Sequence, residues 1–561
     1  MTADAWIRTG ASSWTVSLRR RKIGAMALPA RLLQPALPGL AVSLFVVATV
    51  GGLALAGGGY GPVVWGLAGL GFLWVLAVGV VVVTRVQFGA LEAVALASFA
   101  ALLAWTGLSV LWSLDVAQSV VEVQRGVVAL AGLSVLLLFA RRGAAVAVLG
   151  GLVSACTLAS FVALAGWLSA GAPSGLAISE PVGYANALGL LAAMGLIVAL
   201  GFVTAARAPA GGRLMAGGAA AVLGATLYLS ASRGAVAALG VGLGASLFLA
   251  GARWKAVAIS MAGVAVAGAF VVLAAGIITP TRAPAHVLAW KMAAVGDAGA
   301  ASVSVEPRLR FWAVALRSAG DAPLLGSGAG TFPRTWLERR PLPTPARNVH
   351  NLYLETLAEL GVVGLALLLA TLLAPLVAAA RVRCHPLAPT ATGAYVAFLA
   401  HASVDADWEM PVLLVTALMC GGALLIMARP PKVRRRVVPA ARAGALAAVL
   451  ALAAFAYIGV MGNAALERSR EVARVGALDI ASVHARAALR WAPWSGEPWG
   501  VLADAALAGG DEELARTRFA RGLHRDRHSW LLWKGLARAR HGAARREAAR
   551  RAAALNPLGR R

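Results

Sequence analysis

The residue types best suited to acid–base chemistry in this chain gather around one histidine. His350 begins the run His-Asn-Leu-Tyr-Leu-Glu, so that Asn351 follows it directly and Glu355 lies about one helical turn further on. Histidine titrates near neutral pH, and a neutral imidazole can take a proton from a hydroxyl group. A histidine at the start of a helix can equally be a structural residue, and the sequence alone leaves both interpretations open.

Three arginines could hold an anionic group on the same side of the membrane. Arg233 lies in the short run 230–234 between two apolar stretches, and Arg308 and Arg310 open a short amphipathic helix that we expect to begin at Pro307. A guanidinium group presents a planar fork of donors that suits phosphate oxygens. The alternatives are that Arg233 snorkels to lipid headgroups and that Arg308 and Arg310 are solvated residues of an interfacial helix.

The composition is that of a polytopic membrane protein. The chain has 561 residues, of which 60% are apolar and 13% charged, whereas a soluble protein carries about a quarter charged residues. Apolar runs of about 20 residues, each long enough to span a bilayer, predict an all-α fold with about 12 to 13 transmembrane helices. We expect these spans near residues 38–57, 62–84, 89–112, 124–140, 144–169, 182–206, 214–231, 234–251, 256–278, 353–380, 388–404, 410–428 and 442–461.

The distribution of basic residues predicts how these spans are oriented. Lys and Arg gather in alternate short loops, as the positive-inside rule requires, which places the N-terminal segment 1–37 in the cytoplasm. The transmembrane domain then covers residues 38–461, and its long loop 279–352 lies outside the cytoplasm together with the tail 465–561. The net charge of +27 follows from these loops and the tail, and we expect no nucleic-acid partner.

The tail 465–561 contains an internal repeat. Trp499 and Leu502 are followed 34 residues later by Trp533 and Leu536. A period of about 34 residues is that of tetratricopeptide helix pairs, so we expect a tetratricopeptide-like α-helical tail. The alternative is a generic Arg-rich helical tail without repeat architecture.

No metal or nucleotide site is predicted. The three cysteines show no disulfide framework and no metal-ligand spacing, and the sequence has neither a P-loop nor a His-x-x-x-His zinc motif. Asp405, Asp407 and Glu409 form the nearest acidic group. Because further oxygen ligands are missing, we expect a solvated outer loop at these positions and not a cation site.

Three groups of motifs resemble the O-antigen ligase and polymerase superfamily of bacterial membrane proteins. Their order, together with a long outer loop, carries the resemblance. The groups are 183–188 followed by 230–234, then 308–312 with 323–332, and finally 350–361.

The resemblance implies a metal-independent integral-membrane glycosyltransferase without a cofactor. Such a protein of the bacterial cytoplasmic membrane transfers a glycan from an undecaprenyl-diphosphate carrier to an acceptor sugar hydroxyl at the outer face. His350 would be the base on the acceptor, and Arg233 and Arg308 would hold the diphosphate. Arg310 is a rival for Arg308, which we prefer because it stands four residues before Trp312, as the family's arginine does.

The same resemblance implies the partners. They are a lipid-linked glycan donor, a glycan or glycolipid acceptor and membrane lipids, and a protein bound by the tail remains open. Asn351 and Glu355 are expected to support His350. The motifs do not separate a ligase from a polymerase.

Two functions of other classes are also open at this stage. One is a transporter or flippase of envelope lipids, and the other is a membrane scaffold that acts through its repeat tail. A transporter is expected to bury charges near the bilayer midplane on broken helices, whereas the predicted spans contain almost no ionisable residues. A scaffold needs no base and no anion-binding arginines on one membrane face.

Overall fold

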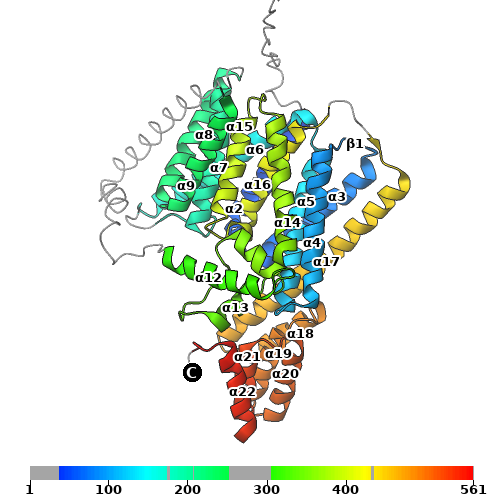
Figure 1. The fold of residues 1–561 in the computed structure, drawn as a ribbon, viewed down its shortest axis with the longest axis vertical. Coiled ribbons are helices and arrows are strands. Elements are labelled where there is room, and N and C mark those ends of the chain that lie inside the picture. The colour runs from blue at the N-terminus through cyan, green and yellow to red at the C-terminus, as the bar shows by residue number, and fades with distance from the viewer. Residues whose placement is uncertain (1–36, 173–176, 206–207, 252–304, 431–434, 560–561) are drawn as a thin grey trace, which may run out of the picture.

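The computed structural model describes residues 37–172, 177–205, 208–251, 305–430 and 435–559 (Figure 1). Within these ranges nearly every element is a helix, and the two short strands, β1 (Arg85–Val86) and β2 (Arg435–Arg436), pair in antiparallel orientation. The expected all-α fold is confirmed for this part of the chain. Figure 1 shows the membrane helices packed side by side, with the tail helices projecting from one end of the bundle.

Nine helices of the described residues are long and apolar enough to cross a membrane. They are α3 (Pro62–Val82), α4 (Ala90–Leu108), α5 (Val116–Phe139), α6 (Ala145–Ser169), α7 (Ala185–Thr204), α8 (Ala210–Leu229), α9 (Arg233–Ala250), α14 (Leu352–Arg381) and α17 (Pro439–Arg474).

Shorter apolar helices complete the bundle. They are α15 (Ala388–His401), α16 (Pro411–Met427), and the continuous run of α1 (Leu37–Val46), the π-helical turn Val47–Gly51 and α2 (Gly52–Leu55). Each expected span that falls on described residues therefore corresponds to a helix. The expected span 256–278 lies outside the described residues, as do positions 1–36 and 279–304 of the expected cytoplasmic segment and outer loop.

Two helices exceed their predicted spans for identifiable reasons. α5 begins at Val116, well before the expected residue 124, because the Asp115 carboxylate caps it by accepting from the Gln118 N–H at 3.1 Å. An apolar-run criterion misses the polar first turns of this helix. α17 continues from the expected span 442–461 into the tail without a break, so the predicted boundary between the two falls inside one helix.

The helix α7 lies at the centre of the bundle, and most of its membrane-spanning length is buried. Glycines allow its neighbours to approach closely, as small residues do in membrane helix packing. A Cβ atom at Gly195 would lie 2.7 Å from the Cβ of Cys156 on α6, and one at Gly189 would lie 2.6 Å from the Ser230 hydroxyl after α8. This packing fixes the start of α7.

A buried ion pair joins the helix ends opposite the tail. Nε of Arg429 lies 2.5 Å from the Glu92 carboxylate, and both side chains are almost inaccessible to solvent. Arg429 also donates to the carbonyl groups of Leu137 and Ala140 at the end of α5. Since buried charges are tolerated only when they are paired and hydrogen-bonded, this contact fixes α4, α5 and the end of α16 relative to one another.

The helix α14 is interrupted at Gly361, whose φ of 67° and ψ of −169° are not helical. The Ser327 N–H donates to the Ala358 carbonyl at 3.1 Å, on the N-terminal side of the break. The Gly328 N–H donates to the Glu359 carbonyl at 2.8 Å. The glycine-rich segment 323–332 thereby supplies donors to a helix whose own ladder is broken, which satisfies backbone groups that would otherwise be costly to bury.

Two further helices lie between the bundle and the tail in Figure 1, namely α12 (Val305–Asp321) and α13 (Phe332–Arg339). They share a small apolar core with the segments before and after the start of α14. Its buried residues are Phe311, Val314, Ala315, Phe332, Trp336, Val349 and Ala358.

The tail consists of α17's C-terminal turns and five short helices, and the last four of these, α19 to α22, share a separate apolar core. The five helices are α18 (Leu478–Trp491), α19 (Glu497–Ala508), α20 (Glu512–Arg525), α21 (Trp530–Arg538) and α22 (Gly542–Leu555). α20 begins 34 residues after α18 and has the same length. The assignment of these helices to tetratricopeptide repeats stays a prediction.

We predict that Gly361→Ala destabilises the protein by roughly 1–3 kcal/mol, because this φ and ψ combination is accessible essentially to glycine alone. An added Cβ would also overlap the backbone of Leu324. The melting temperature in detergent should fall. Gly240→Ala is the matched control, since its Cβ meets open space on α9, and an equal change in both variants would contradict the prediction.

Candidate functional site

The connection after α15 carries a buried carboxylate that two other segments contact. Asp405 is only 1% exposed. The Tyr184 hydroxyl donates to it at 2.9 Å and the Asn186 amide donates at 2.7 Å, both from the start of α7. Arg308 of α12 approaches the same oxygen, Oδ2, at 3.4 Å. These donors compensate for the loss of water around the charge.

The phenol of Tyr184 is fixed as a donor in this cluster. Burial and the negative charge of Asp405 both raise the pKa of Tyr184, and its hydroxyl is hydrogen-bonded to that carboxylate. The hydroxyl therefore stays protonated and donates throughout the physiological pH range.

The segment that carries His350 joins the same connection. The Leu352 N–H donates to the Ala402 carbonyl at 2.8 Å. His350 itself has a φ of 56°, a left-handed conformation that is unfavourable for a residue with a Cβ. Its ring stacks on Phe311 with centroids 5.6 Å apart. Such strain persists only where surrounding contacts impose it, and here the hydrogen bond and the stacked ring impose it.

The environment of His350 favours the neutral imidazole. Burial lowers the pKa of His350 below its usual value, the Asp405 charge opposes this effect, and the Arg308 charge adds to it. Nδ1 of His350 lies 3.4 Å from the carbonyl oxygen of Asn348. Since a carbonyl oxygen can only accept, the contact requires the hydrogen on Nδ1, which leaves Nε2 as the basic nitrogen.

The predicted arginines occupy two helices near this connection. Arg308 contacts Asp405, and Arg310 lies two residues further along α12, so its Cβ leaves the opposite side of that helix. Arg233 is exposed at the start of α9, and the next residue, Gly234, lies against His401. The structure thus brings His350, Arg308 and the start of α9 to the connection 401–407.

The predicted supporting residues hold the backbone around His350. Asn351 caps α14 by accepting from the N–H groups of Tyr353 and Leu354 in its first turn. The Glu355 carboxylate accepts from the Val349 N–H at 2.7 Å. Glu359 accepts from Gly330 at 2.7 Å and from Phe332 at 2.8 Å. They therefore fix the position of the histidine and of the segment 323–332.

The acidic group after α15 is not a solvated loop, and that prediction is wrong. Asp405 and Asp407 are each 1% exposed, and Glu409 is partly buried. Asp407 lies 2.7 Å from Nδ1 of His401, and burial raises the pKa of Asp407. Donors from distant segments make this burial possible.

Among the described residues, the acidic, histidine and cysteine side chains form no group of three that could hold a metal ion.

Residues 218–369 match the family model for O-antigen ligase. This segment is similar to O-antigen ligases, and the apolar helices fit a membrane protein of that kind. The match runs from within α8 to within α14 and includes Arg233, Arg308, Arg310 and His350. No curated protein matches the chain.

The residues that sequence reasoning missed lie outside the matched ligase segment. Asp405, Tyr184 and Asn186 form the buried cluster, yet the match ends at residue 369. Tyr184 and Asn186 stand in the motif 183–188, which was noted without an assigned role. Asp405 could have been found by asking which carboxylate neutralises Arg308, but the chain offers many carboxylates, and only the fold selects one.

We predict that Asp405→Asn lowers the pKa of His350 further, because the Asp405 charge raises it in the native protein. Diethyl pyrocarbonate modifies the neutral imidazole, so the pH midpoint of His350 modification, followed by peptide mass spectrometry, should move to lower pH. Asp479→Asn, at an exposed position in the tail, should leave the midpoint unchanged. An unchanged or higher midpoint in Asp405→Asn contradicts the described electrostatics.

Proposed function

We propose that this protein transfers a glycan from an undecaprenyl-diphosphate carrier to the hydroxyl of an acceptor sugar at the extracytoplasmic face of the membrane. His350 is the base in this proposal, and Arg308 and Arg233 bind the diphosphate. The O-antigen ligase family has a role in cell-surface polysaccharide synthesis as a ligase or polymerase, and the proposal adds the carrier and the residues.

One observation carries the proposal. Arg308 contacts Asp405 at 3.4 Å, and the segment of His350, 42 residues further along the chain, is hydrogen-bonded to the same connection through the Leu352 N–H and the Ala402 carbonyl. A base and a cation that are held at one connection are positioned to act on one substrate. The start of α9, with Arg233, reaches the same connection through the contact of Gly234 with His401.

The proposed step uses each group once. The acceptor oxygen attacks the anomeric carbon of the donor sugar while Nε2 of His350 removes the hydroxyl proton. The bond between the anomeric carbon and the diphosphate oxygen breaks, and its electron pair leaves with undecaprenyl diphosphate. Guanidinium groups stabilise the charge that develops on this leaving group, because charge-assisted hydrogen bonds to phosphate oxygens are strong. The imidazolium then returns its proton to solvent.

The contact between Arg308 and Asp405 suits this role. Asp405 engages one nitrogen of the guanidinium at 3.4 Å, and the Arg308 side chain is 20% exposed. The carboxylate therefore orients the arginine while its other donors can turn to a phosphate group. A guanidinium held in place in advance loses little entropy when the anion arrives.

The broken helix α14 does not favour the transporter alternative. Its buried acids, Glu355 and Glu359, accept hydrogen bonds from backbone N–H groups of the segments that they position. Their hydrogen bonds explain their burial without an ion pathway. The scaffold alternative gives no purpose to the placement of Arg308 and the His350 segment at one connection.

We predict that His350→Ala reduces glycan transfer by about 10²- to 10⁴-fold, the range typical of losing a general base. The glycan profile of a strain that carries the variant is the measurement, with the amount of inserted protein checked in the membrane fraction. His541→Ala is the matched control, because that histidine is 74% exposed in the tail. Normal glycan chains on stably inserted His350→Ala protein would overturn the proposed role.

The two arginines of α12 should differ in the same assay. Arg308→Ala is expected to reduce transfer by about 10²-fold or more, as for the loss of one donor to a developing oxyanion. Arg310→Ala should have a small effect, because its side chain leaves the other side of α12. Arg233→Ala should also reduce transfer. A larger loss of transfer in Arg310→Ala than in Arg308→Ala would assign the diphosphate contact to Arg310.

A further inference from the structure

The short helix α13 connects the tail to the bundle through one arginine. Nε of Arg334 lies 3.0 Å from the Asp115 carboxylate, which also caps α5. Its Nη2 lies 2.5 Å from Asp526, in the turn between α20 and α21 of the tail. A third donor, Nη1, points to the carbonyl oxygen of His528 at 3.4 Å. One guanidinium therefore holds three segments that are far apart in the chain.

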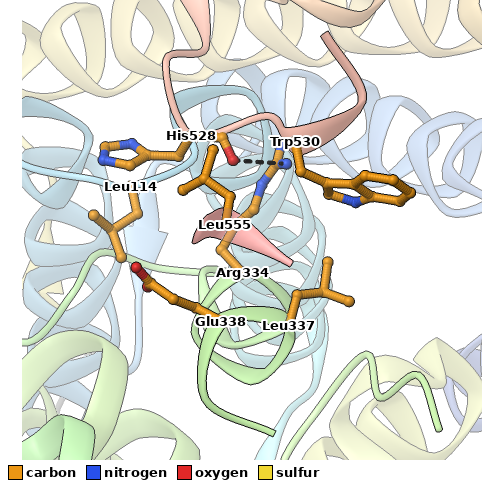
Figure 2. A pocket seen from close by; sticks show the side chains of 7 residues that line it. All are labelled: Leu114, Arg334, Leu337, Glu338, His528, Trp530 and Leu555. Carbon is orange, nitrogen blue, oxygen red and sulfur yellow. Dashed lines mark hydrogen bonds between the residues drawn. The ribbon is translucent and has the colours of Figure 1, made fainter. Parts of the chain in front are cut away.

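This junction is a packed contact and not a ligand site. Figure 2 shows Arg334 directed at the His528 carbonyl, and the cavity beside them has a volume of about 10 Å³, enough for about one water molecule. Burial works to lower the pKa of Arg334, but Asp115 and Asp526 outweigh it and hold the pKa above its usual value. Arg340, one residue past α13, adds a second bond to the tail by donating to Asn556 at 2.9 Å.

The opposite face of α13 leads to the proposed base. Trp336 is fully buried and meets the edge of Phe311 with ring centroids 4.7 Å apart. Phe311 in turn stacks on the His350 ring at 5.6 Å. Two ring contacts, Trp336 with Phe311 and Phe311 with His350, thus connect α13 to the imidazole.

The N-terminal end of α13 is tied to the helix that follows His350. The Glu359 carboxylate accepts from the N–H of Phe332, the first residue of α13. A helix of eight residues has little stability of its own, so its position depends on its tertiary contacts. Those contacts come from the tail and the start of α5 on one face, and from α12 and α14 on the other.

We propose that the tail positions His350 through α13, which makes Arg334 a positioning residue for the transfer reaction. This role of Arg334 in catalysis rests on the proposed function, in which His350 is the base. The physical path consists of the ion pairs of Arg334, the body of α13 and the stacked rings of Trp336, Phe311 and His350. Release of the tail lets α13 shift, and Phe311 then no longer covers the imidazole.

The test measures His350 itself in the full-length protein. Arg334→Met and Asp526→Asn remove the two partners of the tail contact, and diethyl pyrocarbonate at a fixed pH of about 7.5, where histidines are mostly neutral, reports the accessibility of each histidine by peptide mass spectrometry. We expect His350 to react several-fold faster in both variants. Arg334→Lys, which retains the charge, should restore slower modification.

Two controls separate this effect from general unfolding. His401 is 1% exposed and serves as an internal reference, so its reactivity should stay low if the bundle remains folded. Arg538→Met removes an exposed ion pair with Asp504 inside the tail and should leave His350 unchanged. Faster tryptic cleavage in the turn 525–529 would show that the tail has been released.

The outcomes are decisive in both directions. Unchanged His350 reactivity in a protein whose tail is released overturns the proposal, and so does equal acceleration at His350 and His401. In the glycan assay, Arg334→Met should lower transfer by up to about 10²-fold, since a shift of about 1 Å in a catalytic group can cost that much. If His350→Ala transfers normally, the proposed function fails, while the reactivity measurement still decides whether the tail positions this histidine.

Discussion

A negative charge that is removed from water must be matched by donors, and the Asp405 carboxylate shows how this requirement organises the candidate site. Its donors come from the start of α7 and from α12, while the connection that contains it also accepts from the start of α14. Loss of Arg308 would leave this buried charge without its ion partner, which costs several kcal/mol in typical cases, about 3–5. The arrangement of these segments is therefore fixed by one side chain, and His350 and Arg308 are brought together as a consequence.

The same rule explains the interrupted helix α14. A break inside a helix exposes backbone carbonyl groups, which in a membrane bundle must find donors within the protein. The segment 323–332 supplies them, and its glycines at positions 326, 328 and 330, all with positive φ, allow the close approach. The glycine-rich motif and the Glu359–Gly361 motif resembled the ligase family separately in the sequence. In the structure they are two halves of one backbone contact beside the segment that carries His350.

The helices and their approximate limits could be predicted because the bilayer requires long apolar runs. The predicted helix limits differ from the observed ones where polar residues belong to a helix. The capped start of α5 and the C-terminal turns of α17 carry too many polar and charged residues for an apolar-run criterion. The candidates His350, Arg233, Arg308 and Arg310 could be chosen from residue type and motif order. Their supporting contacts could not, since Glu355 and Glu359 act on backbone groups of residues that precede α14.

The sequence by itself determined that the chain is a bundle of membrane helices with a helical tail, because hydrophobic length and period are local properties of the chain. It also determined which residue types are available for base and anion-binding chemistry. Only the tertiary structure decided that Asp405 is buried beside Arg308, that the His350 segment is bonded to the same connection, and that Arg334 joins the tail to α13. Pairings of this kind depend on which of many similar charges become neighbours after folding, and neighbours across more than 90 residues are set by packing of the whole bundle.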